Sequence, residues 1–312
     1  MLSRVADSLY WMARYMERAD SMLRMLKVTY ASSQDNNARD FSWRSALRIF
    51  TYLDDDAIEK LESNSRDVLC LIVTDKENSN SVYNMVINAR ENARSVQDNV
   101  TIELWQCLND FYHLVREPWI EQSLRNNDPI SVLDALIKQG MLYYGIVEYT
   151  MFRSQGLSFM NLGKYLERSF QSNDILDIKF RDISYDMEKP TDTTYWKYLL
   201  LSISGYALYL KSYRSGIESR NVIDQIMFNV SFPRSLAYSL SLLQRNFDRL
   251  KSSSDPENFN QVEFMIGKLH SKVKYSNVNS ISQVGLQHYL HEIHHDLQAI
   301  GQSLNQLYFA YT

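Results

Sequence analysis

The sequence predicts an all-α protein, a multi-helix bundle built from long helices. Its 312 residues contain nine glycines and five prolines, well under half of the roughly 12% that is average for these two residues together. Turns, hairpins and phosphate-binding loops all consume glycine and proline, so an all-β fold is nearly excluded and a nucleotide-binding α/β fold is disfavoured. The hydrophobic content of 45% and the charged content of 22% are ordinary for a globular chain.

Apolar residues at helical spacing define the elements. Leu2, Leu9, Met16 and Leu23 fall on one stripe and predict a helix over residues 2–30. The same spacing predicts further helices over residues 41–53, 66–74, 131–150, 156–170, 195–212, 221–228, 234–251, 257–274 and 282–309.

The longest predicted helix covers residues 82–116, which contain no glycine or proline. It follows a polar loop at 75–81 and would be about 50 Å long at 1.5 Å per residue. We expect it to end before Glu117-Pro118, because the residue before a proline avoids the helical conformation.

An internal repeat underlies this order of helices. The segment YWMARYMERA (10–19) aligns with MNLGKYLERS (160–169) at an offset of 150, so that Glu17-Arg18 matches Glu167-Arg168. The loop DKENSNSVY (75–83) aligns with NVSFPRSLA (229–237) at an offset of 154. We therefore predict a single helical domain over residues 1–312, formed by tandem repeats over 1–150 and 151–312.

Charge and cysteine content exclude several classes of protein. The net charge is −4, and no basic stripe suggests a nucleic-acid partner. Cys70 and Cys107 lie in apolar runs, which indicates buried free thiols in a reducing, cytoplasmic compartment. No uncharged apolar run is long enough to cross a membrane. We also expect no cofactor, because the chain has no Walker or dinucleotide-binding loop and no nucleophile motif.

Two predicted helices carry a second face that mixes charges with aromatic rings. On the first helix, Arg14, Glu17 and Arg18 lie away from the apolar stripe, close to Tyr10 and Trp11. On the long helix, a strip at helical spacing carries Arg90, Glu91, Arg94, Asp98 and Trp105. A solvated face normally lacks tryptophan among its charges.

Three interpretations of these faces stay open: ion pairs on a solvated surface, a partly buried Glu–Arg lattice, or a groove that binds a ligand. In the third, Arg90 and Arg94 hold a carboxylate or phosphate, because the planar guanidinium binds an oxyanion through two hydrogen bonds. Glu17 would then position an amine. The candidate binding residues are Arg14, Glu17, Arg18, Arg90, Glu91, Arg94, Asp98, Glu103, Glu167, Arg168 and Arg234.

A zinc-protease pattern, H-E-x-x-H, occurs at residues 291–295. His291 and His295 point about 160° away from the apolar seam of their helix, and no acid follows Asp296 to supply a third ligand. We therefore interpret this segment as a histidine-rich solvated face and predict no metal site.

The segment NARENARSV (88–96) resembles the bacterial alpha-E family, an all-helical domain of unknown function with recurrent Glu-Arg motifs. The resemblance covers essentially the whole chain and includes SRVADSLYWMARYMERAD (3–20) and IELWQCLND (102–110), the latter with Glu103, Trp105 and Asn109. The loop FPRS (232–235) is similar to the family's Asn-Pro-Arg-Ser loop, with Phe232 in place of asparagine. Gln97 stands where an arginine is common.

The resemblance implies partners more than an activity. Genes of this family lie beside those of circularly permuted ATP-grasp proteins and transglutaminase-like proteins, which suggests a role in ATP-driven amide or peptide bond formation. We expect an accessory component that binds a peptide, an amino-acid-like ligand or a partner protein through the Arg/Glu face. Two alternatives are an enzyme in which Glu17 is the general base and arginines clamp the anion, and a structural scaffold that forms homo-oligomers.

Overall fold

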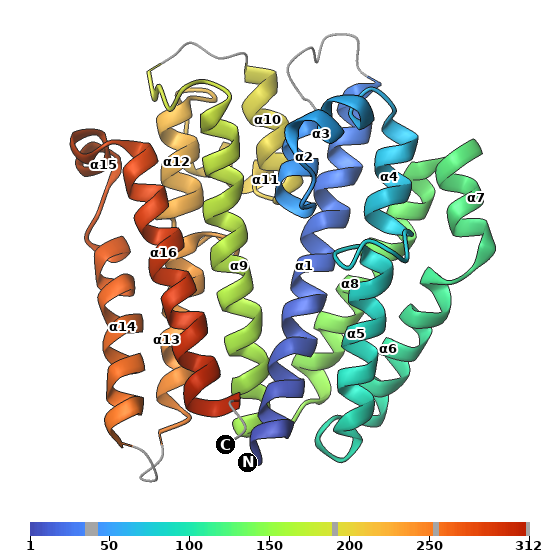
Figure 1. Cartoon of the computed structure of the whole chain (residues 1–312). Helices are drawn as coiled ribbons and strands as arrows, with labels where there is room; N and C mark the ends of the chain where they lie inside the picture. The colour runs from blue at the N-terminus through green and yellow to red at the C-terminus, as the bar shows by residue number, and fades with distance from the viewer. Residues whose placement is uncertain (35–42, 189–192, 252–255, 310–312) are drawn as a thin grey trace. The chain divides into compact units, whose positions relative to one another are not determined.

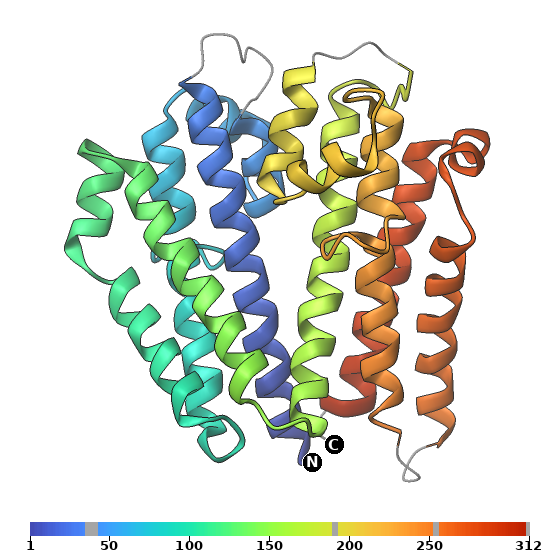
Figure 2. The same ribbon diagram turned by 180° about the vertical axis from the view of Figure 1, so that it is seen from behind.

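A computed structural model describes residues 1–34, 43–188, 193–251 and 256–309. These residues form sixteen α-helices, and the described part of the chain contains no β-strand (Figures 1 and 2). The all-α prediction is confirmed. Contacts divide the chain into two compact units, which are described separately below. Unit 1 consists of Met1–Arg14, Phe152–Thr191 and Ala207–Thr312, and unit 2 of Tyr15–Met151 and Asp192–Tyr206.

Unit 2 contains most helices of the first half of the chain. After the second part of α1 (Ser3–Ser33) come α2 (Trp43–Phe50), α3 (Asp55–Leu61), α4 (Ser65–Val73), α5 (Val82–Ser95), α6 (Ile102–Val115), α7 (Pro118–Asn126), α8 (Pro129–Thr150) and, later in the chain, α10 (Thr193–Ser202). Helix α6 packs between α5 and α8, and α7 packs against α4 and α8. Lys27 on α1 forms an ion pair of 2.5 Å with Asp134 on α8.

Unit 1 is arranged around α9 (Gln155–Arg181), which is buried along most of its length. Its other helices are the first part of α1, α12 (Ser219–Met227), α13 (Leu236–Asp248), α14 (Pro256–Lys274), α15 (Val278–Val284) and α16 (Leu286–Leu304), with α11 (Tyr206–Ser212) at the boundary of the two units. Helices α12, α13 and α16 pack directly on α9, and α14 packs on α13 and α16.

Side-chain caps explain where many helices begin. An oxygen of the residue before the first turn accepts a hydrogen bond from a backbone N–H of that turn, which satisfies a donor that the helix itself leaves without a partner. The capping residues are Asp54, Asn64, Ser81, Thr101, Asp128, Ser154, Ser235 and Asn277.

Three predicted helices are interrupted in the structure, and a fourth, 156–170, is too short, because α9 continues to Arg181. The predicted helix 82–116 is two helices, α5 and α6, joined by a 3₁₀ turn over Gln97–Asn99. Thr101 has an extended backbone and caps α6, so the chain reverses without glycine or proline. The predicted helix 195–212 breaks after Ser202, where Ser204 has a positive φ of 56°. The predicted helix 282–309 breaks at Gly285, whose φ of 95° is a conformation that favours glycine.

The loops before α5 and α13 share local hydrogen bonds at the predicted offset of 154. Asp75 and Asn229 each accept a hydrogen bond from the backbone N–H two residues further on. Ser81 and Ser235 are both fully buried and both cap the helix that follows. These matches support the predicted tandem repeat, which stays a prediction for the chain as a whole.

Helix α8 is the one helix within the described ranges that is long and apolar enough to cross a membrane by length and composition. Core helices of soluble proteins pass the same test, and about a third of the apolar stretch of α8 is buried inside the protein.

Helices α1 and α9 approach each other closely in unit 1. A Cβ atom at Gly163 would lie 2.2 Å from the backbone oxygen of Tyr10, and a backbone atom cannot move aside as a flexible side chain can. The absence of a side chain at this position therefore sets the distance between the two helices.

We predict that Gly163→Ala lowers the free energy of unfolding by at least about 2 kcal/mol, because the added methyl group overpacks this contact. Urea unfolding followed by circular dichroism measures the change. Gly267→Ala on α14 is the matched control: its Cβ would meet only Gln244 Nε2 at 3.8 Å, so alanine should leave stability unchanged or raise it by up to about 1 kcal/mol. Equal effects of the two substitutions would contradict the prediction.

Candidate functional site

Arg90 on α5 is held between two aromatic rings of α6. Its guanidinium carbon lies 4.5 Å from the ring centroid of Tyr112 and 5.2 Å from that of Trp105. Its Nε donates a hydrogen bond to Asn109 Oδ1 at 2.7 Å. The ring stacking and the hydrogen bond fix the plane of the guanidinium, so this cation is preorganised before any ligand arrives.

The turn between α5 and α6 accounts for this arrangement. The sequence analysis put Trp105 on the same strip as the arginines by assuming one continuous helix, whereas α6 folds back on α5 and brings Trp105 over Arg90 from a second helix. Tyr112 was missed for the same reason. A reversal recognised at Thr101 would have shown that Trp105, Asn109 and Tyr112 share one face of α6 at helical spacing.

Glu91 and Arg94 continue this group at the surface. Glu91 contacts the guanidinium groups of both Arg90 and Arg94, and the side chains of Glu91 and Arg94 are 47% and 63% exposed. Asp98 and Glu103 are exposed at and just after the turn. The structure thus brings Arg90, Glu91 and Arg94 together, and we call this group, with Trp105, Asn109 and Tyr112, the Arg90 cluster.

Arg14 and Glu167 form a buried ion pair between α1 and α9. Nε and Nη2 of Arg14 donate to Glu167 Oε2 at 2.9 and 2.8 Å, and the two side chains are 14% and 4% exposed. The Arg14 guanidinium also lies over the rings of Trp11 and Phe170. Burial alone lowers the pKa of Arg14, but the Glu167 carboxylate outweighs it and raises the pKa, so Arg14 stays charged.

Glu17, the candidate general base, is also buried. Its side chain is 0% exposed, and Glu17 Oε2 accepts a hydrogen bond of 2.5 Å from the Tyr144 hydroxyl on α8. The sequence did not single out Tyr144. This geometry fits the interpretation of Glu17 as part of a buried polar lattice, and its role as a base stays a prediction.

The remaining candidates lie near the second Glu-Arg motif. Arg168 Nη1 donates to the Pro233 carbonyl oxygen at 3.0 Å, and Ser172 Oγ donates to the Arg234 carbonyl oxygen at 2.8 Å. Arg168 is 8% exposed, so its side chain holds the loop before α13. Arg18 is half-buried on α1. Of the eleven candidates, unit 1 contains Arg14, Glu167, Arg168 and Arg234, and unit 2 contains the other seven.

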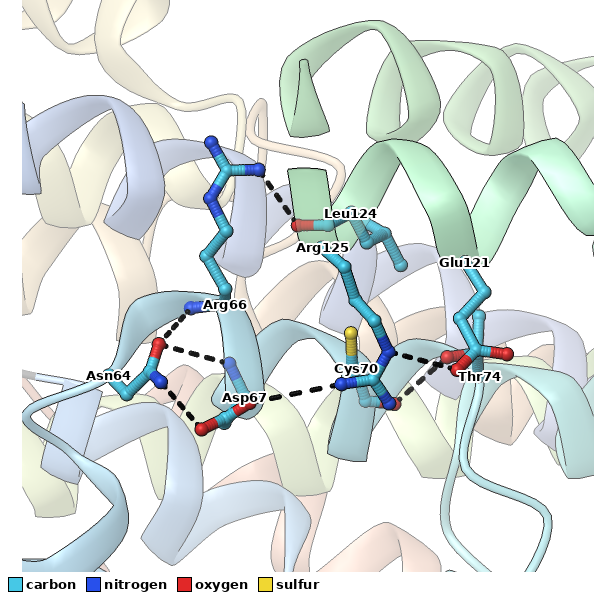
Figure 3. Close-up of polar contacts among 8 residues, drawn as sticks. All are labelled: Asn64, Arg66, Asp67, Cys70, Thr74, Glu121, Leu124 and Arg125. Atoms are coloured by element: carbon cyan, nitrogen blue, oxygen red, sulfur yellow. Dashed lines mark hydrogen bonds and ion pairs between the residues drawn. The ribbon is translucent and has the colours of Figure 1, made fainter. Parts of the chain in front are cut away.

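A further polar cluster joins α4 and α7 (Figure 3). Arg66 donates to the carbonyl oxygens of Leu124 and Asn127 and so caps the end of α7. Arg125 lies beside Cys70 and pairs with Glu121 at 3.0 Å (Figure 3).

The two thiols are free and buried, as the sequence predicted. Burial raises the pKa of Cys70, and it raises that of Cys107 to about 11. Both sulfurs therefore stay protonated at neutral pH, and a thiol is a poor nucleophile compared with its thiolate.

The H-E-x-x-H segment lies on α16. His291 and His295 are exposed, whereas His294 Nδ1 lies 2.8 Å from Asp174 Oδ1 on α9. Within the described residues, no three histidine, cysteine, aspartate or glutamate side chains are grouped as a metal site would need. The hydrogen bond to Asp174 raises the pKa of His294, so this residue links α16 to α9 through a titratable contact.

We predict that Glu167→Gln lowers the free energy of unfolding by about 3 kcal/mol, because it leaves the buried Arg14 cation without its carboxylate. Glu59→Gln on the exposed surface of α3 is the control and should change stability by less than about 0.5 kcal/mol. Denaturant titration measures the free energy of unfolding of both variants. A loss below about 1 kcal/mol in Glu167→Gln would show that the pair does not stabilise the fold.

The His294 contact should make stability depend on pH. The pKa of His294 is raised in the folded state. The stabilisation from its contact with Asp174 is therefore fully present below the ordinary histidine pKa of about 6.5, and it is lost as the pH rises through the pKa of the folded protein. His294→Gln should therefore destabilise the protein at pH 5.5, by about 0.5 kcal/mol given the half-exposed side chain, and have little effect at pH 8.5. Thermal unfolding of His294→Gln and of the exposed control His295→Gln at both pH values tests this; an effect that grows with pH would refute it.

Comparison with known proteins finds similarity to uncharacterized proteins of Mycobacterium bovis and of two strains of Mycobacterium tuberculosis. Each is 22% identical over 324 residues, covering 97% of this chain and 36% of the relative. The chain thus spans about a third of the length of the curated relatives it matches. No solved structure matches the chain.

A family model covers residues 1–309. The family, Alpha-E, is described as a predicted alpha-helical domain with a conserved ER motif, which fits the helices and the Glu17-Arg18 and Glu167-Arg168 pairs of this sequence. The chain therefore belongs to the Alpha-E family.

Proposed function

We propose that this protein is a non-catalytic binding component of an ATP-grasp-linked system that forms amide or peptide bonds, and that the Arg90 cluster is its recognition site. One observation carries the proposal: the Arg90 guanidinium is fixed between Tyr112 and Trp105, while Glu91 and Arg94 beside it are largely exposed. A fixed cation next to exposed charges of both signs suits recognition, because little conformational entropy is lost on binding.

The chemistry of the cluster favours a ligand with both an anionic and a cationic group. The arginines would bind a carboxylate through paired hydrogen bonds, and Glu91 would accept hydrogen bonds from an ammonium group. A peptide terminus, an amino-acid-like molecule or a charged segment of a partner protein meets this description. The buried free thiols suit a protein of the reducing cytoplasm, and we propose that its ligand is found there as well.

The length of the relatives supports a role beside another polypeptide. In the mycobacterial proteins a region similar to this chain accounts for 36% of the molecule, so there it is covalently joined to a larger remainder. The family resemblance suggests a circularly permuted ATP-grasp protein and a transglutaminase-like protein as partners. The burial of Glu17 favours this binding role over the enzyme alternative.

We predict that the tagged protein captures an ATP-grasp protein or an amino-acid-like ligand from its native cells, and that Arg90→Ala/Arg94→Ala loses it. Mass spectrometry of the bound proteins and small molecules is the measurement. Arg90→Lys keeps the charge but loses the stacked planar group, and it should weaken capture at least tenfold. Arg125→Ala, another surface arginine of unit 2, is the control and should capture normally.

The proposal fails if the double variant is folded, by its circular dichroism spectrum, and captures the same molecules in the same amounts as the wild type. Capture that is lost only in a Glu17→Gln variant would instead support the enzyme alternative.

A further inference from the structure

Helix α8 has a second apolar face that its own unit leaves uncovered. Met141, Leu142 and Tyr149 are 57%, 48% and 94% exposed. Gly145 lies among them, and a Cβ atom placed on it would meet nothing within 4 Å. These four positions fall on one side of the helix.

The opposite face of α8 fixes the helix in place. Leu133, Leu136, Ile137, Gly140 and Tyr143 are buried, and α8 packs against α6 and α7. The exposed stripe therefore lies on a helix that packing holds in place. The missing side chain at Gly145 leaves open space between its neighbours, which we call the groove and where a second helix could approach closely.

Two exposed charges flank this stripe. Lys138 and Glu148 lie on the same side of α8 as Gly145, and they are five residues before and five residues after Tyr143. Met141 and Gly145 are likewise two residues before and two after the same point. The stripe is thus complementary to itself when it is reversed in direction.

We propose that this face is the contact of a symmetric dimer, in which α8 of one copy packs antiparallel against α8 of a second copy, centred at the level of Tyr143. Lys138 of each copy then lies opposite Glu148 of the other, and Met141 fills the groove at Gly145 of the other. A two-fold interface uses the same patch on both subunits, and charge complementarity sets the direction and register of the pair.

A second copy explains the stripe better than a lipid bilayer does. The charges of Lys138 and Glu148 at its two ends are costly in hydrocarbon, whereas an antiparallel copy places each of them opposite a charge of the other sign. The dimer is independent of the Arg90 cluster, which lies on α5 and α6, so loss of one function leaves the other to be measured.

Charge reversal tests the register directly. Sedimentation velocity over a range of protein concentrations should show a monomer–dimer equilibrium for the wild type. Lys138→Glu and Glu148→Lys, which each place like charges opposite one another, should weaken dimerisation at least tenfold. The double variant Lys138→Glu/Glu148→Lys restores opposite charges in every pair and should recover most of the wild-type affinity.

Two further variants separate contact from net charge. Lys60→Glu and Glu59→Lys on the exposed surface of α3 change the net charge equally and should leave dimerisation unchanged. Gly145→Trp has room in the monomer and should abolish the dimer by blocking the groove.

The proposal is overturned if the wild type is a monomer throughout, or if it dimerises but the charge swap does not rescue the single variants. A monomer that floats with phosphatidylethanolamine–phosphatidylglycerol vesicles would also overturn it and would assign the stripe to a membrane surface.

Discussion

The contact between the first part of α1 and α9 sets the geometry of unit 1. Tyr10 and Arg14 are one helical turn apart on α1, and Gly163 and Glu167 are one turn apart on α9. The missing side chain at Gly163 lets the backbones approach, and this approach brings the Arg14 guanidinium within 2.8 Å of the Glu167 carboxylate in a site with little solvent. Because a buried charge without a partner is very costly, the close approach of the two backbones and the ion pair between Arg14 and Glu167 depend on each other.

The Glu-Arg motifs therefore contribute mainly to the fold. Glu17 and Glu167 are both buried and both accept hydrogen bonds, from Tyr144 and Arg14 respectively, while Arg168 holds the loop before α13. The proposed recognition site is a different group, the Arg90 cluster, in which aromatic rings fix one cation and leave its neighbours exposed. Under this proposal the costly charge pairs lie inside the protein and the ligand-binding charges lie at its surface.

Periodicity predicted the fold class and the existence of most helices, because the apolar stripes of these helices are long and regular. It failed where helices are interrupted. The turn before Thr101 contains no glycine or proline, and the breaks at Ser204 and Gly285 contain a single glycine each, so the local signals are weak. A helical wheel also gives the direction of a side chain without saying what covers it. The burial of Glu17, and the contact of Arg90 with Tyr112 from a second helix, follow from tertiary packing alone.

A double-mutant cycle at Arg14 and Glu167 tests most directly whether the buried Glu–Arg pair organises the fold. The free energies of unfolding of Arg14→Gln, Glu167→Gln and the double variant, each relative to wild type, give the coupling between the two side chains. The structure predicts a coupling of at least about 2 kcal/mol, since Glu167→Gln leaves the buried Arg14 cation without its carboxylate. Additive losses, with a coupling below about 0.5 kcal/mol, would contradict this account.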